Sequence, residues 1–184
     1  MWGNGILEKL ILFVHVPKTA GQSIFSVVNS QWNYVEHAKH DPLFLLERNN
    51  NIVDAYKFAV VRNPYRRTFS YYKHFNRINC TEYTFGQFLD IIKSGAVFPK
   101  TKMISYSQSF YCLDGSGDIG LDKIYKFENL KELENDLSIS LPHINQGNYS
   151  EYEYFNCYGS EEKQFVKDYY SSDFYNFDYT PDFI

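Results

Sequence analysis

The sequence lacks long hydrophobic runs. No stretch approaches the roughly 20 consecutive apolar residues that a membrane-spanning helix needs. The first nine residues carry no basic region ahead of the apolar run Leu10–Val14, so we interpret that run as a core strand and not as a signal peptide. We therefore expect a cytoplasmic chain without a membrane span.

Cysteine is also scarce. The three cysteines, Cys80, Cys112 and Cys157, are widely spaced and form no C-x-x-C pattern, which argues against a zinc site or a thioredoxin-type redox pair. Without an export signal, we expect these thiols to be reduced. No group of His, Asp and Glu shows metal-ligand spacing, so we expect no metal cofactor.

Positive charge is not in excess. The chain has 18 Lys and Arg against 22 Asp and Glu, a net charge of −4. A broad nucleic-acid surface is therefore not expected, and any anion site must be local. The 17 Tyr and 16 Phe favour an aromatic core over sugar-stacking surfaces. A length of 184 residues suits a single domain over residues 1–184.

The first stretch that suggests chemistry links a strand to a helix. Residues 10–16 read as a buried strand, and apolar residues recur at helical spacing over 22–32. The turn between them can offer backbone N–H groups, a helix N-terminus and the charge of Lys18 to an anion. Because Lys18 precedes Gly21, the Walker A pattern is not met, and an ordinary strand-to-helix turn is the alternative.

A second stretch has the same layout. Lys57–Val61 reads as a buried strand, and Asn63 and Pro64 favour a helix start directly after Arg62. Ser70 lies about 9 Å further along that helix, so Arg62 and Ser70 together would hold a phosphate beside the helix flank. The alternative is a structural ion pair for Arg62 and a packed hydroxyl for Ser70.

The remaining pattern predicts an α/β fold. Two buried strands separated by a helical segment imply a parallel sheet, and Lys123–Phe127 reads as a further strand. Asp114–Asp118 reads as a turn. Helices are expected at Leu43–Leu46, after the capping box Thr84–Gln87, from Leu130 to Leu137, and after an N-cap at Ser160 with Phe165, Val166 and Tyr169 inward. We expect the aromatic tail Asp173–Ile184 to pack on the domain.

Several motifs, in this order and spacing, resemble the carbohydrate O-sulfotransferase branch of the sulfotransferase superfamily. They are His15–Ser23, His37-Ala38, Val61–Ser70, Lys126–Leu130, Pro142–Asn145 and Tyr170–Tyr179. The resemblance implies a P-loop-like three-layer fold with a central parallel sheet flanked by helices. It also implies 3′-phosphoadenosine-5′-phosphosulfate (PAPS) as the sulfuryl donor and a hydroxyl acceptor, either a small molecule or a glycan.

The resemblance also assigns the donor site. It implies a 3′-phosphate site at Arg62 and Ser70, and a 5′-phosphosulfate loop made of Lys18, Thr19, Ala20, Gly21, Gln22 and Ser23. Lys18 would neutralise the leaving phosphate. The chain lacks the membrane anchor and stem typical of that branch, so we expect a catalytic domain of bacterial or viral origin. The acceptor and the oligomeric state are not readable from the sequence.

The proton acceptor is expected to be a histidine. His37 matches the His-Ala step of the resemblance and is favoured, with His40 in the same polar loop as its alternative. His15 reads as a packed strand residue and His74 as a structural helix residue, while His143 has no assigned role.

Two further functions compete with sulfuryl transfer. A P-loop-like small-molecule kinase using ATP is opposed by the missing Walker A spacing and by the Arg62 and Ser70 pair. A non-catalytic nucleotide-binding module is opposed by the presence of Lys18, Arg62, Ser70 and a candidate base. Comparing the binding of desulfated PAPS with that of ADP distinguishes the sulfotransferase from the kinase. Transfer of labelled sulfate to an acceptor distinguishes the sulfotransferase from the non-catalytic module.

Overall fold

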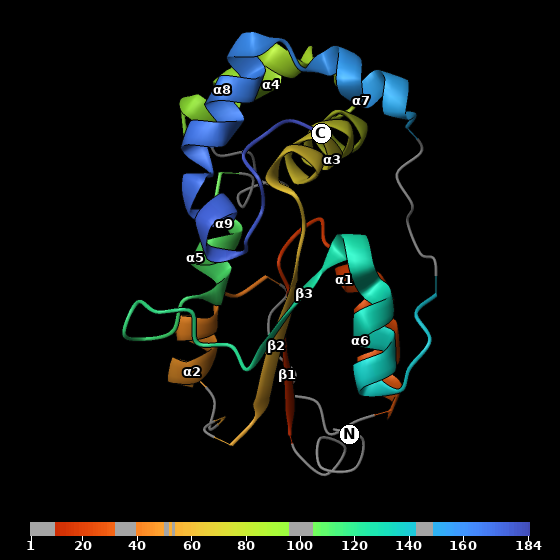
Figure 1. Ribbon diagram of the computed structural model, residues 1–184, viewed down its shortest axis with the longest axis vertical. Coiled ribbons are helices and arrows are strands. Elements are labelled where there is room, and N and C mark those ends of the chain that lie inside the picture. The colour runs from red at the N-terminus through yellow and green to blue at the C-terminus, as the bar shows by residue number, and fades with distance from the viewer. Residues whose placement is uncertain (1–9, 32–39, 50–51, 53, 96–104, 143–148) are drawn as a thin grey trace. The chain divides into compact units, whose positions relative to one another are not determined.

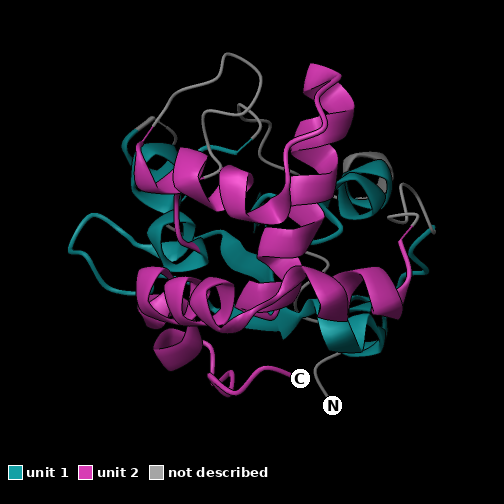
Figure 2. Ribbon diagram, turned by 90° about the horizontal axis from the view of Figure 1, so that it is seen from above, with its two compact units in different colours: residues 1–62, 108–145 teal, residues 63–107, 146–184 magenta. Residues whose placement is uncertain are grey.

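A computed structural model describes residues 10–31, 40–49, 52, 54–95, 105–142 and 149–184. The chain divides into two compact units, coloured separately in Figure 2. Unit 1 comprises Met1–Arg62 and Gln108–Asn145, and unit 2 comprises Asn63–Ser107 and Gln146–Ile184. The single domain over residues 1–184 stays a prediction. No described helix is long and apolar enough to cross a membrane.

Unit 1 contains a small parallel sheet, as the sequence predicts. Its strands are β1 (Ile11–Val14), β2 (Tyr56–Val61) and β3 (Lys123–Lys126), in the order β1-β2-β3. Val14 pairs with Ala59, and Val61 pairs with Lys126. The mixed α/β class and the parallel sheet are confirmed, although β1 is shorter than the predicted 10–16.

Helices flank both faces of this sheet (Figure 1). Helices α1 (Gly21–Gln31) and α6 (Leu130–Leu137) lie on one face, and α2 (Leu43–Asn49) and α5 (Gln108–Cys112) lie on the other. A short 3₁₀ helix, η1 (Phe127–Asn129), joins β3 to α6. The α1 and α6 side is filled by a cluster that includes Ile11, Phe13, Ile24, Phe58, Tyr125 and Leu133. Buried apolar side chains from both strands and helices therefore fix the strand ends in place.

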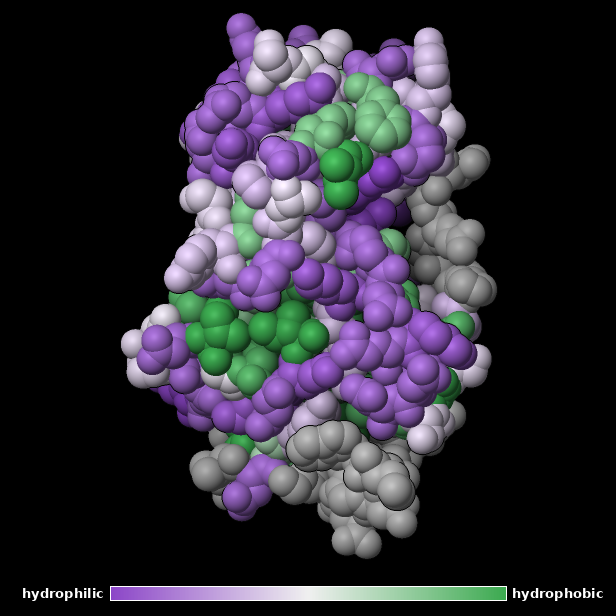
Figure 3. Space-filling view, in the orientation of Figure 1, coloured by the Kyte–Doolittle hydropathy of each residue, from purple (hydrophilic) through white to green (hydrophobic). Residues whose placement is uncertain are grey.

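A closed loop joins α5 to β3 in unit 1. Leu113 and Ile119 form an antiparallel bridge, and the amide of Asp114 donates to the carbonyl of Asp118 at 2.8 Å. The predicted turn at Asp114–Asp118 is thus confirmed. In Figure 3, hydrophobic side chains are visible in this part of unit 1, where Leu113 and Ile119 are partly exposed.

Unit 2 is helical in its described part. Its helices are α3 (Pro64–Asn79), α4 (Phe85–Lys93), α7 (Glu151–Cys157), α8 (Ser160–Tyr169) and α9 (Ser171–Asn176). The predicted caps of α3 and α4 are confirmed. Asn63 accepts from two amides of the first turn of α3, and Thr84 and Gln87 form a reciprocal capping box.

Aromatic side chains dominate the core of unit 2. The cluster includes Tyr65, Phe69, Phe75, Phe85, Phe88, Tyr154, Tyr158, Tyr170 and Phe174. The C-terminal tail closes over it, because the hydroxyl of Tyr65 donates to the carbonyl of Pro181 at 2.8 Å and Phe183 packs against the cluster. The predicted packing of the tail is therefore confirmed, and the abundance of Tyr and Phe has a structural explanation.

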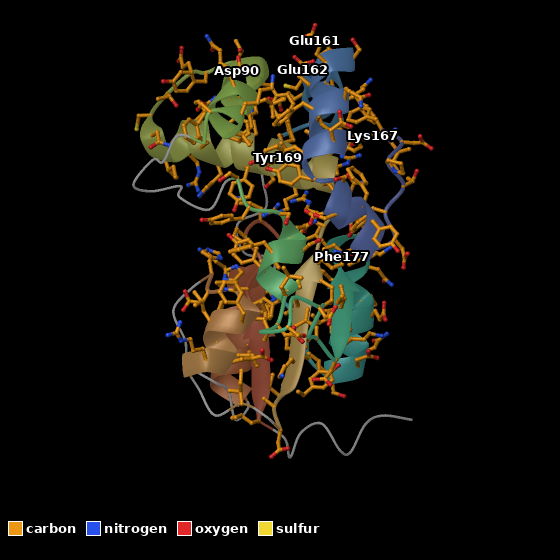
Figure 4. The ribbon with its side chains drawn as sticks, turned by 90° about the vertical axis from the view of Figure 1, so that its left-hand side faces the viewer. Asp90, Glu161, Glu162, Lys167, Tyr169 and Phe177 are labelled. Atoms are coloured by element: carbon orange, nitrogen blue, oxygen red, sulfur yellow. The ribbon has the colours of Figure 1, made fainter. Side chains whose placement is uncertain are left out.

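The end of the chain differs from the prediction in two respects. Ser160 is the first residue of α8 and not its N-cap, which is Gly159, and α8 is followed by α9. Glu161 and Glu162 do lie in the first turn of α8, as Figure 4 shows. Tyr169 was expected to face inward but is 40% exposed, because the neighbouring Tyr170 takes the buried position. Helices α5, α7 and α9 are too short to leave a clear periodic pattern in the sequence.

A buried ion pair connects α3 to α9 within unit 2. A guanidinium nitrogen of Arg67 lies 4.0 Å from a carboxylate oxygen of Asp173, and both side chains are almost completely buried. Arg67 also donates to the carbonyl of Tyr106 at 3.2 Å. Burial raises the pKa of the neighbouring Tyr71 to about 12, so that phenol stays neutral. Asp173 is therefore the carboxylate that balances the buried charge of Arg67.

We expect Asp173→Asn to lower the free energy of unfolding by about 3–5 kcal/mol, because it leaves the Arg67 charge buried without its counter-charge. Urea unfolding of the full chain measures this loss. The matched control is Asp90→Asn on α4 (Figure 4), which removes an exposed pair with Lys93 and should cost less than about 1 kcal/mol. Equal costs for the two substitutions would contradict a structural role for the buried pair.

Candidate functional site

The candidate site lies in unit 1, at the carboxyl edge of the sheet. Because the three strands are parallel, the turns that follow them meet at this edge, which is where open α/β sheets bind ligands. The turn with Lys18 follows β1, Arg62 follows β2, and Phe127 follows β3. The sequence predicted Lys18 and Arg62 as residues of this edge. The observed pairing of β2 with β3 adds Phe127.

The turn after β1 has an unusual backbone. The φ angle is 71° at Lys18 and 66° at Ala20, a left-handed conformation that costs residues with a Cβ about 1–2 kcal/mol each. Helix α1 follows at once, with its first bond from the amide of Ile24 to the carbonyl of Ala20 at 3.2 Å. Left-handed residues just ahead of a helix direct main-chain N–H groups toward one point, which suits an anion. Backbone strain of this kind is often found at ligand-binding turns.

The hydroxyl of Thr19 stabilises this turn from inside. Thr19 is fully buried, and its hydroxyl donates to the carbonyl of Val16 at 2.7 Å. Its proton is thus used within the turn, whereas the resemblance implied a contact with an anion. Ser23 is also buried, Gln22 is exposed, and Lys18 is partly exposed. The roles of Lys18, Gln22 and Ser23 toward an anion stay predictions.

Position 21 must be glycine because the side chain of His15 lies very close to it. The His15 side chain is 3% exposed and packs against the rings of Phe13 and Phe25 at centroid distances of 5.6 and 5.1 Å. A Cβ atom at Gly21 would collide with this imidazole ring. The expectation that His15 is a packed residue is confirmed, and its ring supports the start of α1.

Arg62 contacts the turns that follow both neighbouring strands. Its Nη1 atom donates to the carbonyl of Lys18 at 3.4 Å, and its guanidinium lies over the ring of Phe127, 4.1 Å from the centroid. The structure therefore brings together the Lys18 turn and the Arg62 side chain, which the sequence placed at separate strand ends. A guanidinium stacked on an aromatic ring is held in a defined orientation.

Ser70, the predicted partner of Arg62, belongs to unit 2. It is buried on α3, whereas Arg62 is the last residue of the first segment of unit 1. The pairing of Arg62 with Ser70 around one phosphate stays a prediction.

Of the two candidate bases, the structure describes His40. Its Nδ1 atom lies 3.0 Å from the carbonyl of His15, and the two imidazole rings are 4.1 Å apart. A carbonyl only accepts hydrogen bonds, so Nδ1 of His40 carries the proton and Nε2 is the basic nitrogen. His37 and His143 lie outside the described residues. His74 contacts Arg77 on the exposed side of α3, in line with a structural role.

The sequence assigned no role at this edge to Gln108 or Phe127, although it offered Gln108 as a residue that either borders a site or lies in a solvated loop. Gln108 is fully buried and makes two hydrogen bonds to the main chain of Arg62. Its segment shows no clear periodicity, and a glutamine in such a segment gives no local signal of its partner. Phe127 reads as the last residue of a strand, which does not reveal that it faces an arginine. Among the described residues, no group of three His, Cys, Asp or Glu side chains is placed to hold a metal ion.

We expect Gly21→Ala to lower the free energy of unfolding by about 1–3 kcal/mol, because the added methyl group overpacks the His15 ring. The control is Gly86→Ala in α4, where a Cβ would meet Glu162 at an ordinary 3.6 Å. That change should be neutral or stabilise the helix by up to about 1 kcal/mol. In a His15→Ala background the cost of Gly21→Ala should shrink, and an unchanged cost would contradict this packing.

The chain was compared with family models, with curated proteins and with solved structures, and none of the three comparisons gives a match. The resemblance to sulfotransferases therefore depends on the sequence motifs alone. The geometry at the carboxyl edge of the sheet is independent of that resemblance, since it follows from the parallel strands and from the contacts of Arg62.

Proposed function

We propose that this protein is a PAPS-dependent sulfotransferase with a P-loop-like fold, which transfers a sulfuryl group to a hydroxyl of a carbohydrate acceptor. The observation that carries the proposal is the contact between the Arg62 guanidinium and the Lys18 carbonyl, 3.4 Å. It brings an anion-binding type of turn and a second cation together at one edge of a parallel sheet. The motif resemblance supplies the identity of the donor.

The spacing of the two cationic elements suits a nucleotide with two phosphate groups. The Nη1 atom of Arg62 lies 3.4 Å from the Lys18 carbonyl, so the turn and the guanidinium are close enough to contact two groups on one nucleotide. In PAPS the 5′-phosphosulfate and the 3′-phosphate are attached to the same ribose. The Lys18 turn would hold the first group and Arg62 the second. A guanidinium has five N–H donors, so the bond to Lys18 is compatible with a phosphate contact.

The reaction demands little covalent chemistry from the protein. The acceptor oxygen attacks sulfur in line, the bond from sulfur to the 5′-phosphate oxygen breaks, and adenosine 3′,5′-bisphosphate leaves. Lys18 and the N–H groups of the turn would stabilise the charge that develops on the leaving phosphate. The proton of the acceptor hydroxyl passes to a histidine.

Two histidines are proposed for that proton transfer. His37 is favoured by the motif resemblance. His40 is supported by its position, because the bond from Nδ1 to the His15 carbonyl fixes the ring and leaves Nε2 as the basic nitrogen. Both belong to the segment that precedes α2.

We expect adenosine 3′,5′-bisphosphate to raise the melting temperature of the full chain much more than ADP does, because only the bisphosphate carries a group for Arg62. Arg62→Ala should weaken binding of the bisphosphate about 10- to 100-fold, the range for a lost charge-assisted hydrogen bond, and should leave adenosine 5′-monophosphate binding nearly unchanged. Lys18→Ala should weaken both. Isothermal titration calorimetry measures these affinities.

The controls for this experiment are Arg48→Ala and Lys131→Ala, which remove exposed cations on α2 and α6 of the same unit. Neither should change the affinities by more than about twofold, the size expected of a screened surface charge. Preferential stabilisation by ADP would favour the kinase. Nucleotide binding without transfer of labelled sulfate to any of a panel of sugars would favour the non-catalytic module.

The base is tested with His37→Ala and His40→Asn. Asparagine tolerates the φ of 70° at position 40 and can keep the donor to the His15 carbonyl, while it lacks the basic Nε2 nitrogen. Loss of the base should lower kcat by at least about 100-fold with little change in bisphosphate affinity. We expect one of the two variants to behave so. Full transfer by both variants would exclude a base at either position, and lost bisphosphate binding would make that histidine a donor ligand.

A further inference from the structure

We propose that Gln108 is a positioning residue, which holds the main chain of Arg62 so that its guanidinium meets the 3′-phosphate of the donor. This inference rests on the proposed function, and it adds a residue to which neither the motifs nor the chemistry of transfer assign a role. Gln108 acts through Arg62 and is not itself proposed to touch the nucleotide.

The side chain of Gln108 makes a complete pair of hydrogen bonds with one residue. Its Oε1 atom accepts from the amide of Arg62 at 2.8 Å, and its Nε2 atom donates to the carbonyl of Arg62, also at 2.8 Å. Gln108 is the first residue of α5 and is 0% exposed. A buried carboxamide that satisfies both main-chain groups of one residue, 46 positions away in the chain, is a specific arrangement.

The position of Arg62 in the sheet explains why it needs this support. The pairing of β2 with β1 ends at Ala59, and the pairing of β2 with β3 ends at Val61. Arg62 therefore extends beyond the ladders on both sides. A carboxamide carries the same donor and acceptor as a peptide group, so the side chain of Gln108 continues the hydrogen-bonding pattern by one residue.

Holding the main chain of Arg62 fixes the position of its Cα atom, from which the side chain extends. From this position the guanidinium reaches the Lys18 carbonyl on one side and the Phe127 ring on the other. A cation presented by a fixed backbone loses less conformational entropy on binding an anion than one on a mobile backbone. Gln108 should therefore increase the contribution of the 3′-phosphate to affinity and leave the contribution of the 5′ group unchanged.

The chemistry of the side chain makes glutamine specific at this position. Methionine has a similar length and shape but neither donor nor acceptor. A carboxylate, as in Gln108→Glu, keeps the acceptor for the Arg62 amide but places an oxygen against the Arg62 carbonyl, where a donor is needed. Both substitutions thus keep the volume of the buried side chain and remove one or both of the bonds to Arg62.

The experiment compares the dissociation constants of adenosine 3′,5′-bisphosphate and adenosine 5′-monophosphate for the full chain by calorimetry. We expect the wild type to prefer the bisphosphate by at least about tenfold, because of the extra charge-assisted contact. In Gln108→Met and Gln108→Glu this preference should fall toward that of Arg62→Ala, while monophosphate affinity changes less than about twofold. The double variant Arg62→Ala/Gln108→Met should be no weaker than Arg62→Ala alone.

The control is Gln164→Met, which removes an exposed glutamine bonded to Asp168 on α8 and should keep the wild-type preference. Hydrogen exchange of the Arg62 amide gives a second readout, which should accelerate in Gln108→Met even without nucleotide, because methionine lacks the acceptor for that amide.

Three results would overturn the inference. An unchanged preference in both Gln108 variants would show that Arg62 needs no such support. An equal loss of affinity for both nucleotides together with a lower melting temperature would assign Gln108 a general structural role. If the wild type itself does not distinguish the two nucleotides, the proposed function fails, and the inference fails with it.

Discussion

A single arginine connects the strand ends of the parallel sheet in unit 1. Arg62 extends the central strand, contacts the Lys18 turn after β1 and covers the Phe127 ring after β3. Gln108 holds its main chain from α5. Under the proposed function, displacing Arg62 would separate the two cationic elements that hold the donor.

The site is stabilised by packing at some positions and strained at others. Lys18 and Ala20 adopt left-handed backbone angles, and the close approach of His15 leaves no room for a side chain at Gly21. The left-handed angles cost folding free energy, which the fully buried β1 and the buried residues of β2 help to offset by removing apolar surface from water. Thr19 contributes locally, since its hydroxyl closes the turn. The rigid sheet therefore presents a strained turn, a combination common at ligand-binding sites.

Unit 2 is stabilised by different interactions. Its core consists largely of aromatic rings in edge-to-face contact, and the hydroxyl of Tyr158 reaches the carbonyl of Tyr65 at 2.7 Å. Burial raises the pKa of Tyr158, so this phenol remains a neutral hydrogen-bond donor. The buried charge of Arg67 is balanced by Asp173, which belongs to the C-terminal tail. Tyr and Phe thus supply apolar area, and the tyrosine hydroxyls also supply hydrogen bonds to main-chain groups.

The sequence alone determined the buried strands, the parallel sheet and the caps at Asn63 and Thr84, because periodicity and capping depend on residues close together in the chain. It also placed Lys18 and Arg62 after strands. Only the tertiary structure decided that their turns touch, that Gln108 supports Arg62, and that the hydroxyl of Thr19 faces inward. The contacts of Arg62 join residues 44 and 46 positions apart, and no local pattern encodes which distant partner a buried polar group will find.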